Sequence, residues 1–416
     1  MRCVCYKEVE MNENEVRKMK RRAWVIMLIV FLAGIAMAWA QNKVVPVIDS
    51  VQIDLMIGKT EAGWISSIFC VMGIILSLPA AGMMRKFGVK KTGILAIGST
   101  IIGTLIGIFA PTAALLMISR VIEGFGLGLI SVLAPAVISM WFASEKRGLP
   151  MGIWGAWQMV AQAGTFLFAG SICDAFGGWK GMWWVGLILL VVSIFLYTWK
   201  VTPPPAEYNH ADSEDNSINL FSVMKYRSVW MIALVAMFFT IACFGWATWT
   251  ASYWSEVGGL DFNFANSIVG WVYIAEIFIV IFEGWLLDKI KSRKRFGIIL
   301  ALLYGVLLFF AFNVSEFAGI LVIACIYPFL EGAICTVFWT ICPQTTPDPR
   351  LGAAALAVMV IGLNIGMMLG APIAGAMIEN FGWGAASIVN GIAGLLCAVF
   401  FALIQLYNEK GEKIKG

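Results

Sequence analysis

Four ionisable residues stand within long apolar stretches of the chain: Arg120, Glu123, Glu276 and Glu331. A charged side chain at the centre of a lipid bilayer costs about 2.5–3.5 kcal/mol on insertion scales, so each of these residues needs a partner or a role. Their residue types allow ion pairing, proton transfer or recognition of a charged solute.

Arg120 and Glu123 are three residues apart, which places them on one face of a helix where they can pair. That ion pair could be purely structural. Alternatively, Arg120 could tune a proton-binding site or meet an anionic group. If all four residues ionise, one positive and three negative groups give a net charge of −2. This balance disfavours a strongly basic anion site and suits proton coupling or a cationic or neutral solute.

Glu276 and Glu331 have no basic residue near them in the sequence. A carboxyl group buried without a cation is favoured in its neutral form, so a proton exchanged between the two sides of the membrane could drive transport. The structural alternative is a protonated carboxyl that hydrogen-bonds to a neighbouring helix. Glu283 and Asp288 lie towards the end of their apolar stretch, where we expect water to solvate them.

Amide and indole side chains also occur inside the apolar stretches. Polar groups among aromatic rings are typical of small-molecule pockets, whereas helix packing and interhelical hydrogen bonds are the structural alternative. The candidates for a solute pocket are Trp157, Gln158, Gln162, Trp246, Trp249, Trp339 and Asn364.

The composition indicates an integral membrane protein. Of 416 residues, 60% are hydrophobic and 13% are charged, about half the charged fraction of a soluble protein. The nine cysteines and single histidine show no metal-site spacing, so we expect no metal and no other cofactor. No nucleophile–base pair or nucleotide-binding motif is found, and a net charge of +4 says little about nucleic acid. We therefore expect neither an enzyme nor a nucleic-acid-binding protein.

Twelve stretches are long and apolar enough to span a bilayer as helices, which takes about 20 residues each. A polar linker with a Pro triplet, 200–228, divides them six plus six. We predict an all-α polytopic protein with two pseudo-symmetric six-helix bundles, 24–199 and 229–408, between cytoplasmic tails 1–23 and 409–416. The predicted spans are roughly 24–42, 62–83, 92–110, 113–140, 149–173, 182–199, 229–252, 265–287, 296–313, 317–341, 351–377 and 385–407.

Lys and Arg are distributed unevenly between the two sides of the predicted membrane. With a cytoplasmic N-terminus, 25 of them fall in cytoplasmic segments and three, Lys43, Lys59 and Lys180, fall in outside loops. Because basic residues are enriched on the cytoplasmic side, we expect both termini in the cytoplasm and the protein in the plasma membrane.

Short sequence markers recur about half a chain apart. The basic segments AGMMRKFGVKK (81–91) and GWLLDKIKSRKR (284–295) begin 203 residues apart, and so do Arg147 and Arg350. Glu-Gly and Gly-Trp dipeptides recur in the same order at similar offsets. Internal repeats of this kind are typical of transporters whose solute site lies between the two halves near mid-membrane.

These segments resemble motifs of the major facilitator superfamily. The family's basic loop motif, G-x-x-x-D-[RK]-x-G-[RK]-[RK], has Arg85 in place of Asp in the first-half copy. The second-half copy has Lys291 where Gly is usual. The family's helix motif R-x-x-x-G-x-G is matched from Arg120. The positions that fit are Lys86, Gly88, Lys90, Gly284, Asp288, Lys289, Arg293, Arg120, Gly124 and Gly126.

The resemblance implies alternating access, in which two halves rock about a central site. In that family, the Asp of the basic loop contacts the opposite half near the start of the eleventh helix and steadies the outward-facing state. Because Arg85 reverses this charge, we predict a contact between Arg85 and Asp348 when the cytoplasmic side is closed. Arg350 belongs to the same segment, and Asp288 is predicted to meet Arg147. Solvated charges are the alternative.

The favoured function is secondary active transport of a small organic solute, coupled to protons. We favour a carboxylate metabolite, because Arg120 could face one carboxylate while a glutamate carries the proton. Export of amphipathic or cationic compounds is the main alternative, and a non-transporting membrane sensor is a remote one. The expected partners are the solute, protons and the lipid bilayer, and the expected assembly is a monomer.

Overall fold

The computed structural model describes residues 13–77, 79–143, 146–205, 208, 220–290, 292–408 and 411–414. Within these residues, twelve helical segments are long and apolar enough to cross a membrane, from Arg17–Leu55 to Trp383–Leu403. The predicted all-α polytopic fold with twelve spans is confirmed.

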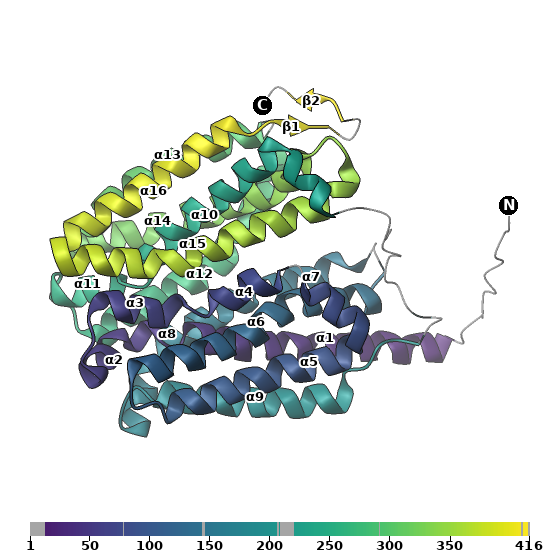
Figure 1. The fold of residues 1–416 in the computed structure, drawn as a ribbon, viewed down its shortest axis with the longest axis horizontal. Helices are drawn as coiled ribbons and strands as arrows, with labels where there is room; N and C mark the ends of the chain where they lie inside the picture. The colour runs from purple at the N-terminus through teal and green to yellow at the C-terminus, as the bar shows by residue number, and fades with distance from the viewer. Residues whose placement is uncertain are drawn as a thin grey trace.

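The first six spans form the N-terminal bundle, in the lower part of Figure 1. Several of these spans consist of more than one helix. A short 3₁₀ turn, η1 (Val45–Val47), follows the first helix. The helices are α1 (Glu13–Asn42), α2 (Ile48–Leu55), α3 (Lys59–Ser67), α4 (Cys70–Leu76), α5 (Pro79–Ile108), α6 (Ala113–Trp141), α7 (Gly148–Gly155), α8 (Trp157–Phe176) and α9 (Gly181–Lys200).

The last six spans form the C-terminal bundle, in the upper part of Figure 1. Short 3₁₀ turns, η4 (Leu220–Lys225), η5 (Cys342–Thr345) and η6 (Pro349–Leu351), lie outside the long helices. Two short antiparallel strands, β1 (Leu406–Tyr407) and β2 (Lys413–Ile414), follow the last span, with Leu406 opposite Ile414. The helices are α10 (Arg227–Ala247), α11 (Thr250–Glu256), α12 (Phe262–Lys289), α13 (Arg293–Ala311), α14 (Phe317–Ile341), α15 (Gly352–Phe381) and α16 (Trp383–Leu403).

Three spans are interrupted within the apolar region. The breaks separate α3 from α4, α7 from α8, and α10 from α11. An interrupted helix leaves backbone groups without their usual partners, and a membrane interior tolerates such groups only where protein or water satisfies them. The breaks therefore mark places where other protein groups or water must satisfy the backbone.

The basic segment 81–91 is helical except at one residue. It lies within α5, whose backbone leaves the helical conformation at Gly88, with φ 76° and ψ 163°. A positive φ strains residues that carry a Cβ atom, so the glycine of the motif permits the sharp change of direction here. The predicted turn between the second and third spans is thus centred on Gly88.

The two bundles pack through two pairs of spans. Helices α3 and α4 of the second span lie against α15 of the eleventh, and α8 of the fifth span lies against α12 of the eighth. The second and fifth spans of one bundle thus pair with the eleventh and eighth spans of the other. Such equivalent pairing is expected of two related halves. In Figure 1 the bundles lie close together at the end that carries α2, α3 and α11, here called the far end. They diverge towards the opposite end, where α1 begins, here called the termini end.

Polar contacts join the bundles at the far end. Lys59 Nζ lies 2.6 Å from Glu256 Oε1 and also faces the rings of Trp249 and Trp383. The Thr60 hydroxyl donates to Glu379 Oε2 at 2.7 Å, across the same boundary. The far end is therefore closed by side chains of both bundles.

Lys59→Ala combined with Thr60→Ala is expected to loosen the far end. The Lys59–Glu256 bridge is partly exposed, so its loss costs only about 0–1 kcal/mol. A free-energy change of that size still shifts a two-state equilibrium by up to about fivefold. Spin labels at Glu61→Cys and Asn380→Cys should show a longer distance component in the double variant. An unchanged distribution would contradict this role, and Arg350→Ala, which removes a pair within one bundle, is the control.

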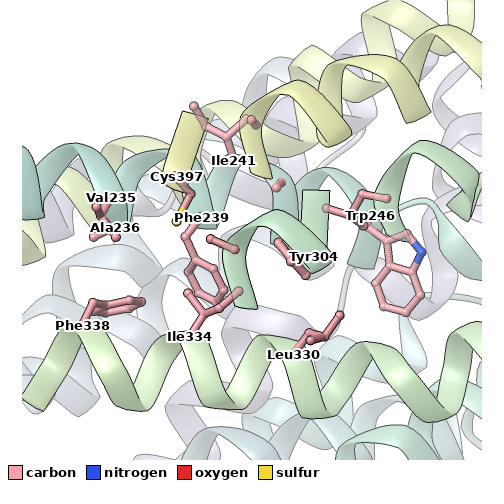
Figure 2. Packing of buried hydrophobic residues seen from close by; sticks show 14 of the residues in the cluster. Val235, Ala236, Phe239, Ile241, Trp246, Tyr304, Leu330, Ile334, Phe338 and Cys397 are labelled. Atoms are coloured by element: carbon pink, nitrogen blue, oxygen red, sulfur yellow. The ribbon is translucent and has the colours of Figure 1, made fainter. Parts of the chain in front are cut away.

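A cluster of buried apolar residues fills the C-terminal bundle and reaches residues of the N-terminal bundle such as Ala62 and Phe166. In the C-terminal bundle the ring of Phe239 lies 5.4 Å from that of Phe338 and 5.8 Å from that of Tyr304. Figure 2 shows these residues between the helices, with Trp246 farther along the same cluster. The core fixes α10 against α14, and these helices contribute to the site described next.

Candidate functional site

A cavity of about 550 Å³ lies between the two bundles. It extends from mid-span residues such as Asn364 to residues near the termini end, such as Ser77 and Ala353. The described residues that line it are all uncharged. Five predicted pocket residues are among them: Trp157, Gln158, Gln162, Trp339 and Asn364.

The amide groups on the cavity wall are held in place by hydrogen bonds. Gln158 Nε2 donates to Gln41 Oε1 at 2.9 Å, which joins α8 to α1. Asn364 Nδ2 donates to the Val360 carbonyl oxygen at 2.9 Å. Because Gln41 and Gln158 belong to one bundle and Asn364 to the other, a solute between them would contact both halves.

Aromatic rings form the apolar part of the wall. The ring of Trp157 stacks on that of Trp154 at 4.8 Å with an interplanar angle of 12°. Phe69 and Phe244 line the cavity from α4's preceding turn and from α10. A flat solute face can pack on such rings while its polar groups reach the amides.

Two predicted pocket residues lie elsewhere. Trp246 is fully buried in the C-terminal core, where its ring stacks on that of Tyr327 at 3.7 Å. Trp249 is also fully buried, and its indole N–H donates to the Ala371 carbonyl at 3.0 Å beside Lys59. Both indoles support helix packing in this structure and do not line the cavity.

The predicted Arg120–Glu123 pair is present, with a distance of 2.6 Å between Arg120 Nη1 and Glu123 Oε2. Three further guanidinium N–H groups donate to the backbone carbonyls of Ala40, Gln41 and Ile65. Arg120 therefore ties α6 to the end of α1 and to the interrupted second span. Its side chain is fully buried and does not reach the cavity.

Lys43, which the sequence placed in an outside loop, is fully buried. Its ammonium group lies 2.6 Å from Glu123 Oε1 and faces the ring of Trp183 at 4.6 Å. Thr104 shares the same carboxylate oxygen, with a distance of 2.8 Å. Lys43, Arg120 and Glu123 thus form a buried ion triad with a net charge of +1. The first span continues beyond its predicted end at residue 42. The Lys43 ammonium group can lie inside the bundle because it is paired with the Glu123 carboxylate.

Only a thin layer separates the triad from the cavity. A void of about 10 Å³, room for a single water molecule, lies beside Arg120 and Glu123. The residues that line both this void and the cavity are Gln41, Phe69, Gly124 and Leu127. The positive triad therefore acts on the cavity through its electric field rather than by contact.

The C-terminal bundle holds carboxyl groups without a cationic partner among the described residues. Glu331 Oε1 lies 2.9 Å from Cys243 Sγ, whose thiol can donate to it. Glu276 is 6% exposed and lies within electrostatic reach of Glu331. This contrasts with the N-terminal triad, in which every charge is paired.

Glu283, expected to be solvated, is instead 2% exposed. Neither of its carboxyl oxygens makes a well-formed hydrogen bond within the described part of the chain. It packs against Gly332, the residue after Glu331. The span does not reach water at this depth because α14 covers this face of α12. A bare buried carboxylate is costly, so Glu283 joins Glu276 and Glu331 as a group suited to holding a proton.

The predicted latch residues lie at the termini end. Asp348 pairs with Arg350, with 2.9 Å between Oδ2 and Nη2, and this hydrogen-bonded pair holds the pKa of the Asp348 carboxyl below its usual value. Arg147 donates to the carbonyls of Ser139 and Phe142. The side chain of Asp288 lies outside the described residues. Because the bundles diverge at this end, the Arg85–Asp348 contact of the closed state stays a prediction.

The remaining motif residues lie on α5, α12 and α13 at this end. Lys86 faces the ring of Phe87 at 5.5 Å, and Lys289 faces that of Trp285 at 3.5 Å. Gly284 lies on α12, where a methyl group would meet no atom within 4 Å. Lys90 lies on α5, and Arg293 is the first residue of α13.

The family model described as Major Facilitator Superfamily matches residues 26–355 of the chain. The hexuronate transporter of Bacillus subtilis is 22% identical over 396 residues, which cover 88% of this chain and 91% of that protein. The agnestins efflux protein AgnL12 of Paecilomyces divaricatus is 24% identical over 70% of this chain and 66% of its own length.

Other relatives match over shorter stretches. An uncharacterised transporter of the same family, YhcA of Bacillus subtilis, is 26% identical over 42% of this chain. The match spans only 34% of the length of YhcA. Among solved structures, a D-xylose–proton symporter superposes with a TM-score of 0.73 at 17% identity, covering 94% of this chain and 99% of that one. The structural likeness shows a shared fold.

Proposed function

The chain belongs to the major facilitator superfamily and is a membrane transporter; on this premise we propose that it moves a small hydroxylated organic acid together with a proton. The observation that carries the proposal is the uncharged amide-and-aromatic cavity next to a buried triad of net charge +1. Hydroxyl groups suit amide partners, and the positive field favours a single carboxylate.

The size and lining of the cavity support a solute of this class. Gln41, Gln158 and Gln162 present amides from the N-terminal bundle, and Asn364 presents one from the C-terminal bundle. Trp157 offers a ring face for the less polar side of the solute. The similarity to the hexuronate transporter, which extends over most of the chain, supports a sugar-acid substrate.

Proton coupling is assigned to the carboxyl groups of the C-terminal bundle. Glu276 and Glu283 are buried and Glu331 is half-buried, and none of the three has a cationic partner among the described residues, so each is less costly when protonated. Loss of a proton to one side of the membrane and gain from the other would link the proton gradient to the rocking of the bundles. Entry of one anion with one proton leaves the buried charge unchanged.

The orientation follows from the basic residues. Lys43 lies inside the bundle, so only Lys59 and Lys180 remain for the outside loops. The excess of Lys and Arg on the proposed cytoplasmic side is therefore larger than the sequence alone indicated. The termini end is then cytoplasmic, and the cavity lies towards the cytoplasm in this structure. A single chain forms the whole cavity, so we expect a monomer in the plasma membrane.

Efflux of amphipathic compounds is the second candidate. Apolar side chains of α15, including Leu356, Val360 and Met367, line the cavity, and AgnL12 is an efflux protein. Cationic solutes would meet the positive field of the triad, so neutral amphipathic compounds fit this alternative better than cations do.

A solute panel separates the candidates. The purified protein is melted with D-glucuronate, D-glucose, a neutral amphipathic compound or an aromatic cation. A ligand that binds only the folded state stabilises it by about 2.7 kcal/mol at a hundredfold excess over Kd. We expect D-glucuronate to raise Tm and Gln158→Leu to abolish that rise. A rise with the amphipathic compound alone would favour efflux, and no rise with D-glucuronate would refute the proposed substrate class.

Gly73→Ala is expected to weaken D-glucuronate binding about tenfold. A methyl group at position 73 on α4 would collide with the side-chain amide of Asn364 on α15. The amide must then move from its position on the cavity wall. We expect this to reduce the free energy of binding by about 1–2 kcal/mol. Isothermal titration gives the Kd. Gly152→Ala is the matched control, since no atom lies within 4 Å of the added methyl group, and equal weakening by both substitutions would argue against the role of Asn364.

A further inference from the structure

A second hollow, away from the solute cavity, lies at the termini end between α1 and α9. Its volume is about 420 Å³. Four of its lining residues are basic and none is acidic. The lining consists of Lys18, Arg21, Arg22, Val25, Ile26, Trp199 and Lys200.

The hollow lies at the boundary between charged and apolar sequence on both helices. On α1 the basic run ends at Arg22 and the apolar run begins at Ala23. On α9 the apolar run ends at Trp199, and the basic residue Lys200 follows it. Because both helices belong to membrane spans, this boundary marks the level where lipid headgroups meet the hydrocarbon. Tryptophan is enriched at the same level in membrane proteins.

The basic side chains of the hollow are arranged by specific contacts. The Arg22 guanidinium donates to the Thr202 hydroxyl at 2.9 Å and faces the ring of Trp141 at 5.6 Å. The Lys200 ammonium faces the ring of Trp199 at 3.8 Å. Arg22 thus joins α1 to the segment that follows α9, which keeps the two sides of the hollow together. In Figure 1 the start of α1 extends beyond the rest of the bundle at this end.

We propose that this hollow, formed by Lys18, Arg21, Arg22 and Lys200 above Val25, Ile26 and Trp199, binds the phosphate headgroup of an anionic phospholipid. The four cations would surround the phosphate. The apolar side chains below them would contact the first methylene groups of the acyl chains. Basic pockets between membrane helices are suited to phospholipids with more than one phosphate charge, so cardiolipin is the preferred probe.

The site has no part in the solute cavity, since the two hollows share no lining residue. Its occupant would stabilise the contact between the first and sixth spans of the N-terminal bundle. The proposal therefore depends only on the membrane-spanning fold and stands whatever the transported solute is.

Native mass spectrometry of the purified full-length protein tests the proposal. The protein is titrated with cardiolipin, phosphatidylglycerol or phosphatidylcholine, and the Kd of the first bound lipid is measured. Each Lys or Arg near an anionic surface contributes a factor of about five in affinity. We expect cardiolipin to bind at least tenfold more tightly than phosphatidylcholine. The triple variant Lys18→Gln, Arg21→Gln, Lys200→Gln should lose at least tenfold in cardiolipin affinity, with Arg22 retained for its contact with Thr202.

The control removes the same charge at the same end but outside the hollow. This control is a second triple variant on α5: Lys86→Gln, Lys90→Gln, Lys91→Gln. Its Kd for cardiolipin should stay within about twofold of the wild-type value, since these residues do not line the site. Equal losses in the two triple variants would show diffuse attraction and overturn the proposal. So would an unchanged Kd in the first variant. Competition by inorganic phosphate at a concentration similar to that of the lipid would identify a simple anion site instead. Lys200→Glu serves as a second variant if the triple variant melts early in neutral detergent.

Discussion

Glu123→Gln is expected to destabilise the folded protein by about 3–5 kcal/mol, because it leaves two buried cations without their shared anion. Lys43 and Arg120 both lie 2.6 Å from oxygens of this carboxylate, and both are fully buried. The amide of glutamine would keep the shape of the side chain but not its charge. Thermal melting in a mild detergent should show the loss as a markedly lower Tm.

Lys43→Met provides the matched comparison. It removes one cation but leaves Glu123 paired with Arg120 and close to Thr104, so its cost should be smaller. The double variant Lys43→Met, Glu123→Gln restores the triad's net charge of +1 and should melt above Glu123→Gln alone. If the two substitutions were simply additive, the triad would not act as a unit.

Glu331→Gln is expected to lower proton-driven accumulation of D-glucuronate at least tenfold. Glutamine retains an oxygen that can accept from Cys243 but cannot take up or release a proton. Exchange of solute for solute needs no net proton movement, so it should stay within about threefold of the wild-type rate. Proteoliposomes with and without an imposed pH gradient give both rates.

Glu61→Gln is the control for this experiment, since Glu61 is an exposed carboxylate at the far end. Its accumulation ratio should match that of the wild type. If Glu331→Gln lowered exchange as strongly as accumulation, Glu331 would be needed for the rocking motion itself. The coupling role would then pass to Glu276 or Glu283.

The spans could be predicted because hydropathy and length are properties of contiguous sequence. The amides Gln158 and Asn364 could also be predicted as pocket residues, because a polar side chain within an apolar stretch is visible in the sequence itself. Trp246 and Trp249 have the same local signature as Trp157, but their burial depends on neighbours from other helices, such as Tyr327. Sequence spacing alone does not distinguish the two situations.

Lys43 and Glu283 show what the sequence could not determine. Lys43 follows an apolar run and looks like a loop residue, yet its partner Glu123 comes from a helix 80 residues away. Glu283 is close to a basic segment in sequence, yet α14 covers it. Gln41 was also missed, although the polar triplet Gln41–Asn42–Lys43 directly after an apolar run is a usable signal. Three polar residues at that position indicate either a membrane end or a buried polar site.

Proton movement driven by the solute tests the central claim most directly. Proteoliposomes containing a pH-sensitive dye are mixed with D-glucuronate in the absence of any other gradient, and the uptake of labelled D-glucuronate is followed in parallel. We predict that the lumen of wild-type vesicles acidifies as D-glucuronate enters, and that Glu331→Gln vesicles show no acidification. Entry of D-glucuronate at an unchanged lumen pH in wild-type vesicles would contradict proton coupling.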